Sequence, residues 1–226
     1  MQKFTSIYQH ALERKGGQQA LDELMPICST NNQLIAFKDS EYLAAMTKKI
    51  FQSGFVWKVV ENKWDGFEEV FWGFDPDKLV YASDEQIDKM AQNKRIIRNY
   101  IKVKAVRENA YFVQELSKAH QGFGHFIADW PSTDITQLWL YLKKHGCRLG
   151  GNTGPYFLRT MGKDTFLLTR DIVRYFITHG LVDRQPNSQR DLKIVQATFN
   201  DWQQQSGRSM AEISRIVACT QGENYI

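Results

Sequence analysis

The chain has 226 residues, of which 42% are apolar and 24% are charged, and a formal net charge of +4. This apolar content can build a buried core, which excludes disorder, and no apolar run approaches the roughly 18 residues that a membrane span requires. The charge favours a polyanionic partner only weakly, because a basic balance also occurs in many proteins that never bind one.

The first predicted element is an amphipathic helix within residues 1–17, which carries charges along its length. It lacks the apolar stretch and the small-residue cleavage site of a secretory signal, so we expect a cytoplasmic protein. The three cysteines, Cys28, Cys147 and Cys219, are odd in number and far apart. We therefore expect reduced thiols rather than disulfides or a four-cysteine metal site.

Helix-start signals follow in chain order. Asp75 and Pro76 form an N-cap and a first-turn proline ahead of residues 77–82, and Ser83 caps residues 84–92. The later predicted helices and their caps are 134–146 after Ser132 or Thr133, 189–205 after Ser188, and 211–220 after a capping box of Ser209 and Glu212.

Strand alternation is nearly absent, and glycines fall between the helical segments, where short turns need them. We predict an all-α fold with eight to eleven helices. Because the chain has no internal repeat, low-complexity tract or long linker, we expect residues 1–226 to form one compact domain.

The most informative stretch, residues 142–176, runs from a basic helix end through a glycine-rich turn into a second helix and then to an acidic residue. Glycines would let the turn pass close to a phosphate, and a helix from about Thr153 would point its first N–H groups at that anion. An ordinary helix turn with solvated lysines is the alternative. The candidate phosphate-binding residues are Gly150, Gly151, Thr153, Gly154, Lys144 and Arg148.

Two basic clusters could face phosphates. Arg95, Arg98, Lys102 and Lys104 are expected on one basic helix, and residues 143–148 form the approach to the hairpin. Solvated faces are the alternative for both clusters.

The order of Leu149-Gly150-Gly151, a second helix, Gly162 and then residues 163–171 resembles the helix-hairpin-helix DNA glycosylase superfamily. The resemblance implies that Asp171, which stands 20 residues after Gly151, is the catalytic carboxylate. A helix N-cap is the alternative role for Asp171. The rival acid, Asp164, is expected to cap a helix or to stay solvated.

A second resemblance covers residues 34 to 116. The strings LIAFKDSEY, FQSGFVWKVVENKWDGFEEVFWGFDPDKL and IIRNYIKVKAVRENA closely resemble 3-methyladenine DNA glycosylase I in the same order. It implies that Phe37 and Trp57 line the base pocket, with Tyr42 as a further candidate. For most aromatics of this region, core packing is the alternative: Phe55, Trp57, Trp64, Phe67, Phe71 and Trp72.

The chain departs from the family pattern at two positions. Lys38 stands where the family has a metal-binding histidine, and the C-terminal His/Cys pair is missing, so we expect no zinc and no iron–sulfur cluster. The one metal site that stays open is a cation bound by the backbone carbonyl oxygens of the hairpin. Lys49 stands where the family has a base-reading glutamate, which puts base specificity in question.

Together the resemblances imply a two-lobed helix-hairpin-helix glycosylase fold, with one lobe at about residues 55–165, the hairpin at 143–162, and the other lobe at 1–54 plus 166–226. They imply hydrolysis of the N-glycosidic bond of alkylated bases, 3-methyladenine first, in double-stranded DNA. No lysine lies between Lys144 and Lys163, and Thr153 aligns with the superfamily's lysine nucleophile, so we expect a monofunctional enzyme.

We further expect a monomer that binds no membrane and works in bacterial cytoplasm near the nucleoid. Two rival readings remain at this point. One is a helix-hairpin-helix DNA-binding protein without catalysis, and the other is an unrelated helical protein with an accidental glycine turn.

Overall fold

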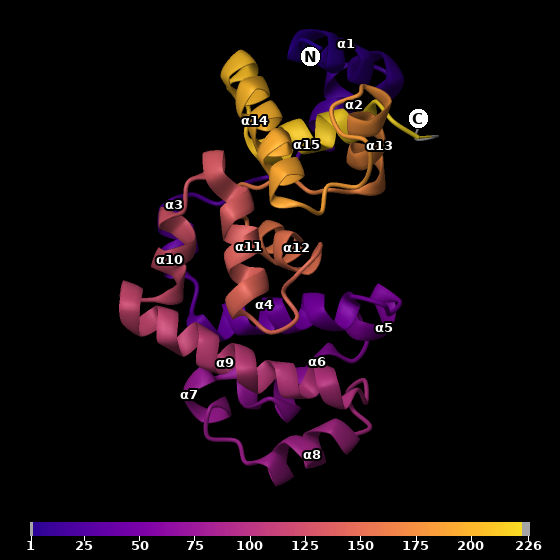
Figure 1. Ribbon diagram of the computed structural model, residues 1–226. Helices are drawn as coiled ribbons and strands as arrows, with labels where there is room; N and C mark the ends of the chain where they lie inside the picture. Colours follow the sequence, from indigo (N-terminus) through magenta and orange to yellow (C-terminus); the bar gives the residue numbers. More distant parts are fainter. Residues whose placement is uncertain (1, 223–226) are drawn as a thin grey trace. The chain divides into compact units, whose positions relative to one another are not determined.

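The computed structural model describes residues 2–222, and every regular element in that part of the chain is helical (Figure 1). The predicted all-α class is confirmed. The predicted count of eight to eleven helices is wrong for the described residues, because it missed short helices such as Gln18–Asp22, Trp57–Glu61 and Pro76–Leu79, which have no long periodic pattern. The helices are α1 (Phe4–Lys15), α2 (Gln18–Asp22), α3 (Asn31–Ala36), α4 (Asp39–Gln52), α5 (Trp57–Glu61), α6 (Trp64–Val70), η1 (Trp72–Phe74), α7 (Pro76–Leu79), α8 (Asp84–Gln92), α9 (Tyr100–His120), α10 (Phe123–Asp129), η2 (Ser132–Asp134), α11 (Ile135–His145), α12 (Thr153–Thr160), α13 (Arg170–Thr178), α14 (Gln189–Ser206) and α15 (Met210–Cys219).

Side-chain caps fix most of the predicted helix starts. Ser83 and Ser209 each form a capping box, and Asp75 and Ser188 each accept a hydrogen bond from a first-turn backbone N–H. The predicted cap at Ser132 or Thr133 is wrong, since residues 132–134 form the 3-10 turn η2, whereas the helix predicted over 134–146 is present as α11, Ile135–His145.

The chain divides into two compact units, each assembled from separate segments. Within the described residues, the first unit contains 2–28, 131–136 and 164–222, and the second contains 29–130 and 137–163. Residues 29–54, which we expected in the same lobe as the chain ends, group with the second unit because α3 contacts α10 and α4 contacts α9. One compact domain over the whole chain stays a prediction.

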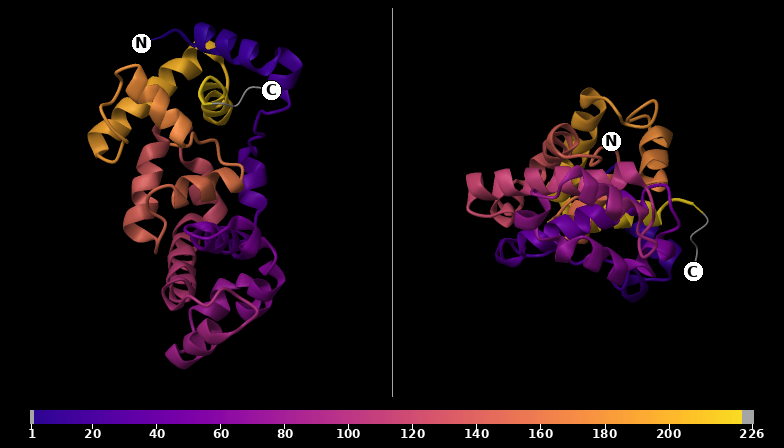
Figure 2. Two further views of the ribbon diagram at one scale, coloured as in Figure 1. Left: turned by 90° about the vertical axis from the view of Figure 1, so that its right-hand side faces the viewer. Right: turned by 90° about the horizontal axis from the view of Figure 1, so that it is seen from below.

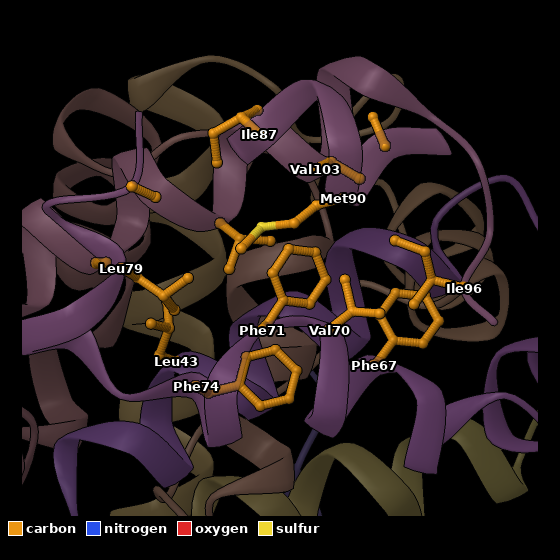
Figure 3. Close-up of a cluster of buried hydrophobic side chains, with 14 of the residues drawn as sticks. Leu43, Phe67, Val70, Phe71, Phe74, Leu79, Ile87, Met90, Ile96 and Val103 are labelled. Atoms are coloured by element: carbon orange, nitrogen blue, oxygen red, sulfur yellow. The ribbon is translucent and has the colours of Figure 1, made fainter. Parts of the chain in front are cut away.

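The second unit is organised around α9, which contacts α4, α7, α8 and α10 and runs beside α4 in both sets of views (Figures 1 and 2). Phenylalanines of α6 and η1 fill the space between these helices (Figure 3). Gly66 admits this packing, because a Cβ there would lie 2.5 Å from the Arg95 carbonyl oxygen. Labelled members of this core include Leu43, Phe67, Phe71, Phe74, Leu79, Ile87, Met90 and Val103.

The first unit packs α1, α13 and α14 around α15. Its core contains Trp202, which is fully buried, and the stacked rings of Phe166 and Phe199, whose centroids lie 4.1 Å apart. Arg14 of α1 donates from Nε to the Cys219 carbonyl oxygen at the end of α15, at 3.0 Å. The N-terminal helix is therefore tied to the last helix of the chain.

The structure also tests the predictions for the cysteines and for the aromatic side chains. Cys28, Cys147 and Cys219 are free thiols, as predicted. Phe67 and Phe71 are core residues, whereas Phe55, Trp57 and Trp72 are exposed. Across residues 2–222, the helices fall short of the length and apolar character that crossing a bilayer demands.

Candidate functional site

A cavity of about 310 Å³ lies in the second unit, between the end of α4, the start of α5 and the hairpin that precedes α12. This volume is at the lower end of the roughly 300–1,000 Å³ range of small-molecule sites. The lining residues are Lys49, Gln52, Ser53, Trp57, Gly150, Gly151, Asn152, Thr153 and Tyr156.

Two aromatic rings form the apolar wall of this cavity. Trp57 is the first residue of α5 and leaves 51% of its surface exposed. Its ring meets the Tyr156 ring edge to face, with 5.9 Å between the centroids. The cavity thus presents an indole ring on which a flat molecule can stack.

The polar wall is a chain of side chains that begins at Lys49. Its Nζ lies 5.1 Å from the centroid of the Trp57 ring and donates a hydrogen bond of 2.9 Å to Gln52 Oε1. Gln52 Nε2 in turn donates to Glu61 Oε1 at 2.9 Å. Burial lowers the pKa of Lys49, because removing water disfavours the charged amine.

The hairpin is held by backbone geometry that its glycines permit. Gly151 has φ +59°, in the left-handed region that glycine favours, and Arg148 has φ +60°. A Cβ at Gly154 would lie 2.6 Å from the Leu149 carbonyl oxygen, so only glycine allows the start of α12 to come this close to the turn. The predicted second helix from about Thr153 is confirmed.

Asn109 of α9 holds the hairpin through two hydrogen bonds. Its buried side chain donates from Nδ2 to the Cys147 carbonyl oxygen at 3.0 Å and accepts from the Cys147 N–H at 2.8 Å. Sequence reasoning did not single out Asn109, because the two residues are 38 positions apart and no local signal links them.

The phosphate-binding candidates take three different positions. Gly150, Gly151 and Thr153 line the cavity, and Gly154 is buried beneath them. Within residues 2–222, the backbone N–H groups of Gly151 and Asn152 make no hydrogen bond, so both are available to an anion. Lys144 and Arg148 are exposed beside the hairpin and do not line the cavity.

Asp171 lies in the first turn of α13, in the first unit, and is half-buried. The N-cap is Thr169, whose side chain accepts from the Ile172 N–H, so the alternative N-cap role of Asp171 is wrong. The Asp171 carboxylate makes no hydrogen bond or ion pair with residues 2–222.

Asp164 has a structural role. Its two carboxylate oxygens accept hydrogen bonds from the backbone N–H groups of Met210 and Ala211, at 3.2 and 2.9 Å, and Oδ1 also accepts a weak one from the Cys28 thiol, at 3.6 Å. These contacts cap the start of α15. Of the two roles expected for Asp164, a helix cap or a solvated side chain, the structure shows the cap. The two acids therefore differ in their contacts: the oxygens of Asp164 accept hydrogen bonds, whereas those of Asp171 have no partner among residues 2–222.

Phe37 and Tyr42 are not among the residues that line the cavity. Tyr42 is fully buried and donates its hydroxyl to the Leu34 carbonyl oxygen at 2.7 Å, and burial raises its pKa above the ordinary range. The Phe37 ring meets the Tyr42 ring edge to face, at 6.0 Å. A base-pocket role for these two residues stays a prediction. Four lining residues were not anticipated: Gln52, Ser53, Asn152 and Tyr156.

The predicted basic helix is wrong. Arg95 and Arg98 lie in the loop before α9, and Arg95 pairs with Glu69. Lys102 is buried, and its Nζ donates to the Ser53 carbonyl oxygen and lies 4.5 Å from the centroid of the Phe55 ring. Lys102 therefore stabilises the turn between α4 and α5 and is not free for phosphate.

A zinc site does not fit the residues present. Among residues 2–222, no three His, Cys, Asp or Glu side chains gather closely enough to hold a metal ion. Burial raises the pKa of the Cys147 and Cys219 thiols, which disfavours the thiolate that binds zinc.

The model of the methyladenine glycosylase family matches residues 34–156, more than half of the chain. Over 76 residues the chain is 33% identical to the DNA-3-methyladenine glycosylase of Haemophilus influenzae, which corresponds to 34% of this chain and 41% of that protein. The chain therefore spans less than half the length of this curated relative.

Solved structures extend the similarity to the fold. The 3-methyladenine DNA glycosylase I of Staphylococcus aureus is 20% identical, with a TM-score of 0.50 over 67% of this chain and 91% of that chain. The 8-oxoguanine DNA glycosylase of Methanocaldococcus jannaschii is 14% identical, with a TM-score of 0.55 over 93% of this chain and 91% of that chain. That enzyme is also known in complex with a 15mer DNA, at a TM-score of 0.51.

The predicted helix-hairpin-helix glycosylase fold is thus confirmed by neighbours that cover 67% and 93% of this chain. The family match includes the α4–α5 wall of the cavity and the hairpin up to Tyr156. The chain belongs to the methyladenine glycosylase family.

Proposed function

We propose that this chain is a monofunctional DNA glycosylase, which hydrolyses the N-glycosidic bond of an alkylated base in double-stranded DNA, with 3-methyladenine as the first substrate. The observation that carries the proposal is the cavity in which the Trp57 ring lies beside the glycine turn of a hairpin. Such a cavity joins a stacking surface for a base to an anion-binding backbone for its phosphate.

The base has to leave the duplex before it can enter this cavity. Extrusion costs a few kcal/mol, and stacking on an aromatic ring returns about 1–3 kcal/mol per base. The free N–H groups of Gly151 and Asn152 would hold a phosphate of the same strand, with Lys144 and Arg148 beside them. We propose DNA as the partner and a monomer as the working form, in bacterial cytoplasm.

Asp171 is proposed as the catalytic carboxylate. Breaking the N-glycosidic bond builds positive charge on the sugar, which an ionised carboxylate stabilises, and the same group can orient the attacking water. The absence of a partner for its oxygens among residues 2–222 supports this role, because a carboxylate held in a structural hydrogen bond would be less free to act.

The monofunctional assignment is supported by the lysines near the hairpin. Lys163 is buried, donates from Nζ to the Ala128 carbonyl oxygen at 3.0 Å and does not line the cavity, so its amine is not placed to attack the sugar of a base held there. Water is therefore the proposed nucleophile. We propose that the reaction needs no zinc, iron–sulfur cluster or other cofactor.

The test is base release from alkylated double-stranded DNA, with released bases identified by mass and borohydride present in a parallel reaction. We expect free 3-methyladenine, an abasic site, and no covalent protein–DNA adduct. Salt-sensitive DNA binding without release of any base would contradict the proposal and favour a hairpin DNA-binding protein without catalysis.

A further inference from the structure

Lys49 brings a positive charge to the wall of the cavity. Its Nζ lies 5.1 Å from the centroid of the Trp57 ring, so a base stacked on that ring comes within reach of it. Among residues 2–222, no carboxylate lies within ion-pair distance of this Nζ, because Glu61 pairs with Lys48 instead, at 3.0 Å. The charge of Lys49 is left for a molecule in the cavity.

The surroundings of Lys49 also favour transfer of its proton. Gln52 accepts one N–H of the ammonium group and is itself held by Glu61, which fixes the amine at the cavity wall. Burial lowers the pKa of Lys49, so its proton passes more easily to a basic atom nearby.

We propose that Lys49 is a catalytic residue that contacts the base, and that its ammonium group allows the cavity to release an uncharged purine with a carbonyl oxygen, in addition to an alkylated base. The proposal rests on the proposed function, because it concerns the same cavity and the same bond.

The step balances without an oxidant or a reductant. When the C1′–N9 bond of an uncharged purine nucleotide breaks, the electron pair goes to N9 and the base leaves as an anion. Lys49 Nζ gives its proton to that base, and the neutral amine regains a proton from solvent. Water adds its hydroxyl group to C1′ and releases its other proton to solvent. The products are a neutral free base and an abasic site.

A purine alkylated at N3 or N7, such as 3-methyladenine, behaves differently. It is already cationic, so it leaves as a neutral molecule and needs no proton. A nearby ammonium group weakens its binding before the bond breaks, and it loses this penalty as positive charge moves to the sugar. Removing the charge of Lys49 should therefore slow release of the uncharged base and not of the cationic base.

The experiment compares two substrates under single-turnover conditions. One is a duplex with a single hypoxanthine, which is an uncharged purine with a carbonyl oxygen, and the other is duplex DNA that contains 3-methyladenine. We expect the wild type to release both. Lys49→Met should slow hypoxanthine release by about 100-fold, the lower range of general acid catalysis, and leave 3-methyladenine release unchanged or faster.

Lys78→Met is the control. Lys78 is an exposed lysine of α7 that pairs with Asp75 at 3.0 Å and lies outside the lining of the cavity. This variant should release both bases at the wild-type rates. If Lys49→Met loses its helical circular dichroism, Lys49→Gln, which keeps a polar contact for Gln52, takes its place.

The outcomes separate this inference from the proposed function. A wild type that releases 3-methyladenine and no hypoxanthine overturns the further activity and leaves the proposed function intact. Equal slowing of both bases in Lys49→Met overturns the role of the charge. Release of neither base by the wild type overturns both.

Discussion

Trp57 is left half-exposed on a segment whose other aromatic side chains include the buried Phe67 and Phe71. Exposing an apolar indole ring to water is unfavourable, and an exposed ring adds little to the core. We therefore interpret the position of Trp57 at the cavity wall as a binding surface. The neighbouring Lys49 likewise presents its amine to the cavity, and its Nζ forms no ion pair with a carboxylate among residues 2–222.

Trp57→Ala should weaken binding of the extruded base by about 1–3 kcal/mol, the value of one stacked base, and slow base release to match. Because half of the Trp57 surface is exposed already, the free energy of unfolding should change little. The measurement is base release next to urea denaturation. Trp72→Ala is the control, because Trp72 is also exposed and lies outside this cavity. A loss of stability that accounts for the slower release would contradict the binding role.

At the scale of elements, the hairpin depends on α9 as much as on its own glycines. The two hydrogen bonds between Asn109 and the Cys147 backbone fix the turn between α11 and α12. The side chain is completely buried, so the turn has no water to replace a lost partner.

Asn109→Ala should therefore lower the free energy of unfolding by about 1–3 kcal/mol for each unsatisfied backbone group and weaken DNA binding through the displaced turn. Denaturant unfolding and fluorescence titration with abasic-site DNA check the two effects. Asn32→Ala, at an exposed position of α3 away from the cavity lining, is the control. Wild-type DNA affinity in Asn109→Ala would show that the anchor is dispensable.

Elements with local signals could be predicted from the sequence, and the rest could not. Ser83, Ser188 and Ser209 cap their helices with side chains a few residues from the N–H groups that they accept from, so the pattern is visible in the string. The hairpin glycines are visible for the same reason. Asn109 and Tyr156 were missed, because their roles arise from contacts between helices far apart in the chain.

At the scale of the whole molecule, each unit is built from separate segments, and the first joins residues near both ends of the chain. The predicted lobe boundary at residue 54 follows chain order, whereas α3 and α4 are grouped by their tertiary contacts with α10 and α9. Basic side chains that flank the hairpin, Lys143, Lys144 and Arg148, stay exposed in the second unit.

DNA affinity should fall steeply with salt, with a slope in log–log form of about −0.9 for each phosphate contact. Lys144→Ala and Arg148→Ala should each reduce that slope by about one contact, because each removes a cation next to the hairpin. Titrations at several salt concentrations measure the slope. Lys78→Ala, an exposed lysine of α7 paired with Asp75, is the control. An unchanged slope in both hairpin variants would place the DNA elsewhere on the protein.

The most direct test of the proposed mechanism is single-turnover release of 3-methyladenine by wild type, Asp171→Asn and Asp164→Asn. We predict that Asp171→Asn slows release by about 100-fold or more, the scale of losing one group that stabilises developing charge, while DNA binding is retained. Asp164→Asn should keep its rate, because Asp164 caps α15. Turnover by Asp171→Asn at the wild-type rate would contradict the account.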